Sequence, residues 1–407
     1  MKFIDLAAQQ KLVKDQIDAN IQTVLSHGNY IMGPEVKELE DKLAAYCGAK
    51  HAVGCASGTD ALLMALMANN VKPGDAIFTT PFTFIATAEI ISLIGATPVF
   101  VDIDPRIFNI DPNKLELAID ALKTRDNATQ RPEPGTRHPK PDTPHPLPLN
   151  PHPAGPLNPR GIIAIDLFGL PADYDSINKI ADKHNLFVIE DAAQSFGAQS
   201  NNKKACNLAD IACTSFFPAK PLGCYGDGGM CFTNDDQLAD TMQSLRVHGK
   251  GNHKYDNARI GINGRLDTIQ AAILLAKFKI FPEEVRMRQQ AAKLYTDLLS
   301  PPTSSEAGLI PPTVPKALQS AWAQYSLLAQ DEHHRSDLQK KLKEQDIPTA
   351  IYYPKPLHLQ TAFNYLYYKE GDFPISEDCS KRIFSIPMHP YLSPEDQERI
   401  AEAISNF

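Results

Sequence analysis

The sequence predicts an α/β protein with a mostly parallel central sheet. Between about Lys50 and Thr233, short runs of apolar and β-branched residues alternate with segments of helical pattern, as in chains built from βαβ units. The length of 407 residues and the hydrophobic fraction of 43% suffice for two or three domains with an ample core. The strands expected in the sheet are residues 52–55, 76–79, 98–102, 162–166, 187–189, 211–215 and 229–233.

The first expected strand runs into a turn of small residues that opens an apolar helix. Ser57, Gly58 and Thr59 form this turn, and the helix follows at residues 61–66. Free N–H groups and the helix dipole favour an anion at such a position, and small residues let it approach the backbone. Ser and Thr are also ordinary N-cap residues. The turn alone therefore leaves both an anion site and a simple cap open.

The strand at residues 187–189 places Asp191 at the carboxyl edge of the sheet, where open α/β sheets bind ligands. Lys220 lies 29 positions later, after Ser215-Phe216-Phe217-Pro218-Ala219 and before a glycine-rich run. Such a loop can bury a lysine and lower its pKa toward the range needed for Schiff-base chemistry. An aspartate can keep a pyridine nitrogen protonated. Together they predict pyridoxal phosphate chemistry, although, taken alone, a loop lysine is usually a solvated cation and a strand-end aspartate is often a helix cap.

Further segments carry a resemblance to a known family. They are Phe3-Ile4-Asp5-Leu6, Gly33-Pro34-Glu35-Val36, residues 57–62, 82–88 and 101–104, and residues 261–272. Over nearly the whole chain they resemble the sugar aminotransferases of the DegT/DnrJ/EryC1/StrS family. This resemblance implies fold type I of the pyridoxal phosphate (PLP) dependent aminotransferases. It implies a large PLP-binding domain at residues 1–280, a long helix after Arg265, and a smaller C-terminal α+β domain at residues 281–407.

The resemblance also implies a role for each residue near the cofactor, pyridoxal 5'-phosphate. Lys220 would bind it covalently and shuttle the proton, and Asp191 would contact its pyridine nitrogen. Gln194 would lie near the ring hydroxyl, and Phe84 would stack on the ring. The phosphate ligands would be Gly58, Thr59, Ser215 and, from the other subunit of a homodimer with shared active sites, Asn263.

Three residues are expected at the substrate. By the resemblance, Arg265 would face a carboxylate or phosphate, which its planar guanidinium can bind with two hydrogen bonds. A surface charge pair with Asp267 explains Arg265 as well. Tyr352 and Tyr353 precede Pro354, where many relatives have His-Tyr-Pro. Tyr352 can donate a hydrogen bond but cannot become a cation near neutral pH, which leaves the sugar specificity open.

Segments 213–218, 222–229 and 388–392 resemble those of members that aminate UDP-2-acetamido-2-deoxy-3-oxo-glucuronate. The expected reaction moves the amino group of L-glutamate to that UDP-linked 3-keto sugar acid, in bacterial surface polysaccharide and lipopolysaccharide O-antigen biosynthesis. The alternatives are a 4-keto or another 3-keto nucleotide sugar, a PLP lyase or dehydratase, and a regulatory or scaffolding protein. Family dehydratases carry histidine at the position of Lys220, so Lys220 disfavours that branch. A scaffold would need neither Lys220 nor Asp191.

Charge and composition exclude several other classes. The net charge of −8 gives no basic footprint for nucleic acid. The sequence shows neither an apolar run of roughly 18 residues nor the apolar region of a signal peptide, so we expect a cytoplasmic protein without membrane contact. Seven scattered cysteines without a C-x-x-C pair favour reduced thiols over disulfides or a metal site.

Residues 125–160 stand apart because they hold about a third of the chain's 33 prolines. Proline removes backbone donors and favours extended, solvated chain. We therefore expect a proline-rich flexible insertion that stays out of the sheet, after a helix that ends near Lys123. Its histidines 138, 145 and 152 do not predict a metal site, and its deletion is expected to leave turnover intact.

Overall fold

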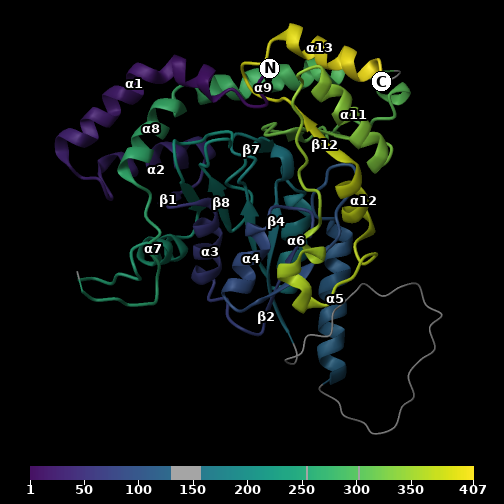
Figure 1. Cartoon of the computed structure of the whole chain (residues 1–407). Coiled ribbons are helices and arrows are strands. Elements are labelled where there is room, and N and C mark those ends of the chain that lie inside the picture. The colour runs from purple at the N-terminus through teal and green to yellow at the C-terminus, as the bar shows by residue number, and fades with distance from the viewer. Residues whose placement is uncertain (130–156, 254, 301–302) are drawn as a thin grey trace, which may run out of the picture.

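The computed structural model describes residues 1–129, 157–253, 255–300 and 303–407. A seven-stranded sheet forms the centre of this part of the chain, in the order β1-β9-β8-β5-β4-β2-β3 (Figure 1). Strand β9 is antiparallel to both of its neighbours, and the other neighbouring strands pair in parallel. The strands are β1 (His51–Cys55), β2 (Asp75–Thr79), β3 (Thr97–Phe100), β4 (Asn158–Ile165), β5 (Phe187–Asp191), β8 (Ile211–Ser215) and β9 (Gly229–Thr233).

Helices cover both faces of this sheet, which confirms the predicted α/β class. Helices α3 (Gly58–Ala68), α4 (Ala86–Leu93) and α7 (Asp236–Leu245) pack on one face around Val53, Ile163 and Ile189. The opposite face is covered by α2 (Pro34–Cys47), α5 (Pro112–Thr129), α6 (Tyr174–His184) and α8 (Thr268–Phe278). Alternate residues of each strand enter the two cores, as the two-residue period of a strand requires.

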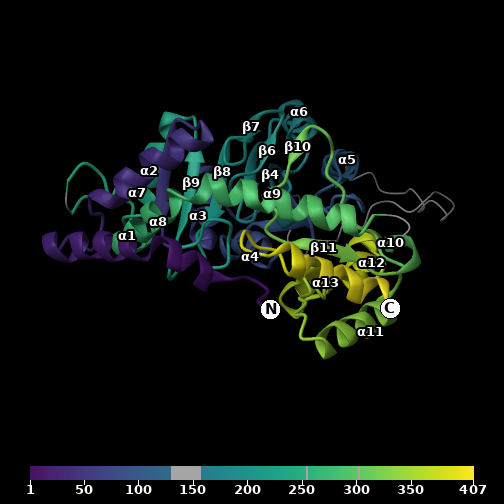
Figure 2. The ribbon, with the colours of Figure 1, turned by 90° about the horizontal axis from the view of Figure 1, so that it is seen from above.

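Apart from the two cores on the faces of the sheet, a C-terminal core lies in the last part of the chain. Strands β11 (Tyr325–Leu328) and β12 (Ile383–Ile386) pair antiparallel and pack with α9 (Phe281–Leu298), α11 (Glu332–Glu344) and α13 (Pro394–Ser405). Helix α9 joins the C-terminal core to a core of the sheet, because Tyr295 lies in the first and Phe281 lies with α2 and α8 in the second. Figure 2 shows α9 crossing the molecule between them. The division at residue 281 stays a prediction.

The remaining elements connect these layers. Helix α1 (Leu6–His27) lies against α8, as Figures 1 and 2 both show. No helix in the described ranges is long and apolar enough to cross a membrane. The short elements are β6 (Gln199–Ser200), β7 (Lys203–Lys204), β10 (Leu318–Gln319), α10 (Thr303–Glu306), α12 (Pro374–Arg382) and the 3-10 turns η1 (Leu167–Gly169), η2 (Leu357–Leu359) and η3 (Thr361–Leu366).

Two sequence predictions need correction. The helix expected to end near Lys123 continues to Thr129, and residues 158–160, which we expected outside the sheet, belong to β4. Pro159 is tolerated there because it lies near the start of the strand, beside an irregularity in the pairing with β2. Most of the predicted proline-rich insertion, residues 130–156, lies outside the described residues.

The long helix expected after Arg265 is in fact two helices, α8 and α9. Pro282 lies in the first turn of α9. Proline is suited to a first helical turn and unsuited to a helix interior, since it lacks the N–H group that the preceding turn would bind. The break between the two helices therefore follows from Pro282.

Candidate active site

Asp191 lies at the carboxyl end of β5, as the strand pattern predicted, and is 6% exposed. Its Oδ2 accepts a 2.8 Å hydrogen bond from the hydroxyl of Thr87 on α4, and its Oδ1 accepts one of 3.2 Å from the Ala193 N–H. Burial raises the pKa of Asp191, and the Thr87 hydrogen bond and the charge of Lys220 oppose that rise. The carboxylate is thus held in a desolvated place where a cationic partner stabilises its charged form.

Lys220 lies in a tight turn after β8, and its positive charge interacts with the Asp191 carboxylate. Its backbone N–H donates to the Phe217 carbonyl at 2.9 Å. Burial lowers the pKa of the Lys220 ammonium, and the negative charge of Asp191 opposes the change. Within the described residues no hydrogen bond or ion pair engages its amino group. A lysine with a lowered pKa and a free amine is suited to nucleophilic chemistry.

The start of α3 and the end of β8 form a close backbone cradle. Ser57 caps the helix by accepting a 3.0 Å hydrogen bond from the Asp60 N–H, while no hydrogen bond in the described structure uses the N–H groups of Gly58 and Thr59. A Cβ on Gly58 would lie 2.7 Å from the Cβ of Ser215, so only glycine fits. The Ser215 hydroxyl accepts from the Phe217 N–H at 3.2 Å, which leaves its own proton free for an anion.

Gln194, Phe84 and Tyr353 form a contiguous group. Gln194 Nε2 donates to the Tyr353 hydroxyl at 3.2 Å, and its Oε1 accepts from the Phe168 N–H at 2.7 Å. The rings of Phe84 and Tyr353 lie 6.2 Å apart between centroids. Phe84 is 55% exposed, so one ring face is accessible to a flat ligand.

Tyr352 extends this aromatic group to Phe3. Its ring lies 5.9 Å from that of Tyr353 and 6.4 Å from that of Phe3. Burial raises the pKa of Tyr352, so its hydroxyl stays protonated near neutral pH. Phe3 was not predicted at this place as a contact of Tyr352, because no periodic pattern links two residues so far apart.

Asn263 and Arg265 precede α8. Their segment contacts the residues before the anion cradle of its own chain, and these contacts are made by the backbone. The Ala56 N–H donates to the Gly264 carbonyl at 3.1 Å, and Arg265 pairs with Cys55. Asn263 is exposed, and in the described structure its side chain forms no hydrogen bond to Gly58, Thr59 or Ser215. The Nε of Arg265 is buried without a partner among the described residues.

The residues present fit pyridoxal phosphate. The cradle at Gly58 offers two backbone donors and a hydroxyl to a phosphate, and it leaves no space for a Cβ. Asp191 offers a buried carboxylate to a protonated pyridine nitrogen, and Lys220 offers a free amine of lowered pKa. These three features lie at one edge of the sheet, because β1, β5 and β8 all end there.

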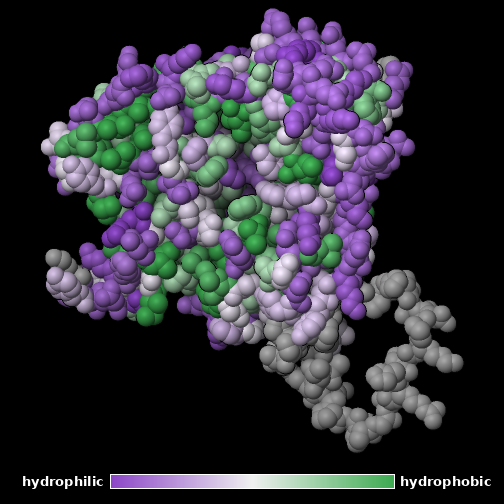
Figure 3. All heavy atoms as spheres, in the orientation of Figure 1, coloured by the Kyte–Doolittle hydropathy of each residue, from purple (hydrophilic) through white to green (hydrophobic). Residues whose placement is uncertain are grey.

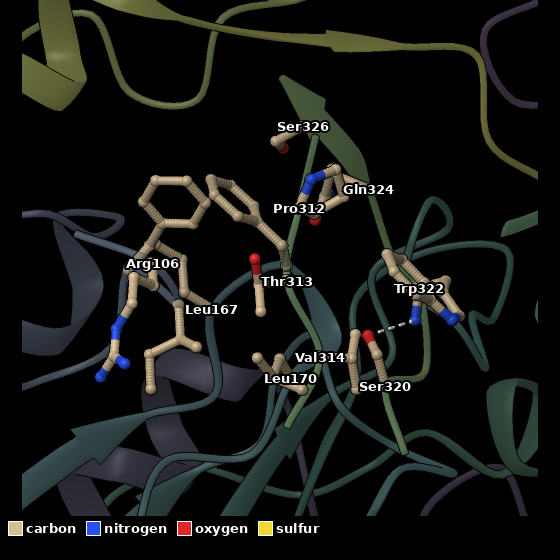
Figure 4. A pocket seen from close by; sticks show the side chains of 13 residues that line it. Arg106, Leu167, Leu170, Pro312, Thr313, Val314, Ser320, Trp322, Gln324 and Ser326 are labelled. Carbon is tan, nitrogen blue, oxygen red and sulfur yellow. Dashed lines mark hydrogen bonds between the residues drawn. The ribbon is translucent and has the colours of Figure 1, made fainter. Parts of the chain in front are cut away.

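Figure 4 shows a small cavity apart from these residues, which is lined by residues such as Phe168, Trp322 and Gln324. Its volume of about 20 Å³ holds roughly one water molecule. The Oε1 of Gln324 is buried there without a partner in the described structure. None of the predicted site residues lines this cavity, which is too small for a nucleotide sugar.

Thr87 is the contact of Asp191 that our sequence reasoning missed. The sequence feature that could have identified Thr87 is a polar residue between two alanines, Ala86 and Ala88, in a segment that is buried. Among the described residues no group of three or more His, Cys, Asp or Glu side chains is arranged to bind a metal. All seven cysteines are buried free thiols.

Comparison with known proteins identifies the family. The sequence profile of the DegT/DnrJ/EryC1/StrS aminotransferase family matches residues 11–405. The chain is 44% identical to the UDP-2-acetamido-2-deoxy-3-oxo-D-glucuronate aminotransferase of Pseudomonas aeruginosa, over 100% of both chains. It is 41% identical to the pleiotropic regulatory protein of Geobacillus stearothermophilus, over 100% of this chain and 98% of that one.

The crystal structure of a DegT DnrJ EryC1 StrS aminotransferase from Brucella abortus is similar throughout, with 45% identity and a TM-score of 0.88. That similarity covers 100% of this chain and 99% of the other. The arrangement of Asp191, Lys220 and the Gly58 cradle described above agrees with an aminotransferase. The chain belongs to the DegT/DnrJ/EryC1/StrS aminotransferase family.

Proposed function

We propose that this protein is a PLP-dependent aminotransferase that moves the amino group of L-glutamate to UDP-2-acetamido-2-deoxy-3-oxo-glucuronate. The observation that carries the proposal is the pairing of the buried Asp191 carboxylate with the partly buried Lys220 amine beside the Gly58 cradle. Desolvation shifts the pKa values of Asp191 and Lys220 in opposite directions, and the charge of each opposes the shift of the other. The choice of substrate rests on the 44% identity to the Pseudomonas aeruginosa enzyme that is named for it. Lys220 disfavours a dehydratase.

Bound pyridoxal phosphate would supply a ring that withdraws electrons from the substrate carbon that loses its proton. In this proposal Lys220 binds the cofactor and then, when free, carries the proton between substrate and cofactor carbons. Asp191 keeps the pyridine nitrogen protonated, and Thr87 orients the Asp191 carboxylate through its 2.8 Å hydrogen bond.

The phosphate is assigned to the cradle at the start of α3. Gly58 and Thr59 supply backbone N–H groups, and Ser215 supplies its hydroxyl. Phe84 stacks on the accessible face of the cofactor ring, and Gln194 lies near the ring hydroxyl. The 3.2 Å hydrogen bond from Gln194 to Tyr353 fixes the orientation of the Gln194 amide.

We propose a homodimer in which each subunit completes the site of the other. Asn263 is exposed and forms no hydrogen bond to the cradle of its own chain, which suits a residue that reaches the phosphate of a second copy. Figure 3 shows apolar surface over α1 and α8. Helix α1 carries Leu12 and Leu25, which are 65% and 46% exposed. A second copy of the chain would bury this surface.

The substrate residues are proposed on the rim of the same site. Arg265 has a buried Nε without a partner among the described residues, so it has unused capacity for a carboxylate or phosphate. Tyr352 and Tyr353 come from the C-terminal part of the chain. We propose that residues 1–280 and 281–407 are separate domains and that the substrate binds between them.

The proposed setting is the bacterial cytoplasm and the assembly of surface polysaccharide, including the O-antigen of lipopolysaccharide. Seven buried free thiols suit a reducing compartment. The product would be an amino sugar acid on UDP, and UDP is a leaving group suited to transfer of the sugar to a growing polymer.

Two alternatives remain distinct from this proposal. One is a different 3-keto or a 4-keto nucleotide sugar, which stays open because Tyr352 stands where many relatives have a histidine. The other is a regulatory role, favoured by the name of the Geobacillus stearothermophilus relative. Incubating the purified protein with L-glutamate and a panel of UDP-linked and dTDP-linked ketosugars separates them, with mass spectrometry of the amino sugar as the readout. Amination of a 4-keto sugar alone would show that the substrate is that sugar and not the proposed 3-keto sugar acid. Amination of none of the sugars would contradict the enzyme function.

A further inference from the structure

Residues 216–226 form the loop that presents Lys220, the Lys220 loop. This loop is closed by a hydrogen bond between its two ends. Its two ends meet where the Cys224 N–H donates to the Phe216 carbonyl at 2.8 Å. Gly223 lies against the start of the loop, since a Cβ there would be 2.5 Å from the Pro218 carbonyl oxygen. Close packing of Gly223 against Pro218 therefore constrains the turn that carries Lys220.

Helix α8 contacts this loop from outside with two side chains. The Oε1 of Gln270 accepts a 2.9 Å hydrogen bond from the Tyr225 N–H. The ammonium of Lys277 donates to the Gly223 carbonyl and lies 4.8 Å from the centroid of the Tyr225 ring. Gln270 and Lys277 are seven residues apart, so two helical turns place them on the same face.

The segment just before α8 contacts Cys55 and Ala56, which lead directly into the anion cradle. The Gly264 carbonyl accepts from the Ala56 N–H at 3.1 Å, and Arg265 pairs with Cys55 at the end of β1. One helix and its N-terminal lead thus touch both the residues before the cradle and the Lys220 loop. A rigid helix between them fixes the distance from the cradle to Lys220.

We propose that Lys277 is a positioning residue which, together with Gln270, clamps the Lys220 loop at the correct distance from the Gly58 cradle. The cradle holds the phosphate of the ligand, and the loop holds the Lys220 amine that attacks a carbon of the same ligand. An error in the spacing between cradle and loop therefore slows the approach of Lys220 to that carbon. Lys277 acts through Gly223 and does not itself touch the ligand. This inference rests on the proposed function.

The burial of Lys277 supports a role beyond packing. Its side chain is 0% exposed, and burial lowers its pKa to about 8, against the opposing charge of Glu284. An apolar side chain of similar length would fill the same space without desolvating a charge. The retained ammonium therefore points to its hydrogen bond with Gly223 as the purpose of the residue.

The test measures how fast the wild-type enzyme and its variants join pyridoxal phosphate to Lys220. Apoenzyme is mixed with the cofactor and quenched with borohydride at intervals, and peptide mass spectrometry gives the labelled fraction of Lys220. We expect Lys277→Met to slow labelling by about 10-fold to 100-fold, with the KM for L-glutamate changed much less than kcat. Lys277→Arg should restore most of the rate, because it keeps a charged donor.

Lys279→Met is the matched control. Lys279 follows two residues later, is exposed and donates to Gln16 on α1 at 2.7 Å, so its loss should leave labelling at the wild-type rate. Labelling of Lys277→Met at the wild-type rate would overturn the inference. If Lys277→Met does not fold, Gln270→Leu decides instead, since it must also slow labelling and equal rates would again overturn the clamp. A wild-type enzyme whose Lys220 is never labelled would overturn the proposed function and this inference with it.

Discussion

Thr87 and Asp191 are joined by a buried hydrogen bond of 2.8 Å, although they lie 104 residues apart in the chain. The bond links the first turn of α4 to the end of β5. It supplies a donor to a carboxylate that burial would otherwise tend to protonate. Thr87 is therefore the residue through which the helix layer controls the charge of the proposed site.

Thr87→Val should lower the rate of the glutamate half-reaction by about 10-fold, because a charge-assisted hydrogen bond contributes roughly 1.5–3 kcal/mol. Removing this donor raises the pKa of Asp191 further above its ordinary value. The acidic limb of the pH profile should then move to higher pH. Stopped-flow absorbance across the acid range measures both effects. Thr87→Ser keeps the hydroxyl and serves as control, and an unmoved acidic limb in Thr87→Val would count against the role of Thr87.

Tyr352→His should alter the second half-reaction and leave the first unchanged. A histidine can become a cation below about pH 6.5, so it should lower the KM for an acidic ketosugar at pH 6 relative to pH 8. Steady-state kinetics at both values, with Tyr352→Phe as control, measure the change. An equal effect on the reaction with glutamate alone would show that Tyr352 does not face the sugar.

Arg246→Met should destabilise the protein by about 3–5 kcal/mol, because it leaves a buried charge without its partner. Arg246 and Glu40 are 6% and 7% exposed, and both also bind the backbone of Gly54. The matched change Arg286→Met breaks the exposed pair with Glu283 and should cost about 0–1 kcal/mol. Thermal unfolding of both variants tests this, and equal losses would contradict it.

Lys277 gives the stability of the protein a distinct dependence on pH. Its pKa is about 8 when folded and 10.5 in the reference state. Between those values the unfolded chain holds a proton that the folded chain has released, so stability rises with pH. Over this window the wild type should gain up to about 3 kcal/mol relative to Lys277→Met.

Apparent Tm values of both proteins from pH 7 to 10.5 measure that gain, with Lys279→Met as control. A constant difference between wild type and Lys277→Met across the range would mean that the Lys277 ammonium is not desolvated.

Much of the fold and part of the site could be predicted from the sequence. The apolar run before Asp191 and the small residues around Gly58 identified a strand end and a helix start, because both signals are local. The contacts of Thr87, Gln194 with Tyr353, and Lys277 with Gly223 could not be predicted. They join segments that only tertiary packing brings together, and periodic patterns carry no information about such pairs.

Pro282 and Pro159 show the limits of local rules. Pro282 was a readable signal for a new helix, since proline favours the first helical turn, and reading it would have divided the long helix correctly. Pro159 predicted an exclusion from the sheet that did not occur, because the sheet pairing is irregular beside it. A proline rule holds only where the neighbouring strand needs the missing donor.

The most direct test of the account is the visible absorption spectrum of the purified protein with pyridoxal phosphate, before and after L-glutamate, for wild type and Lys220→Ala. The account predicts a cofactor band in the wild type that depends on Lys220 and bleaches when glutamate is added. A subsequent UDP-linked 3-keto sugar acid should restore it. A wild-type spectrum identical to that of Lys220→Ala would contradict the account. A Lys220-dependent band that glutamate leaves unchanged would contradict glutamate as the donor.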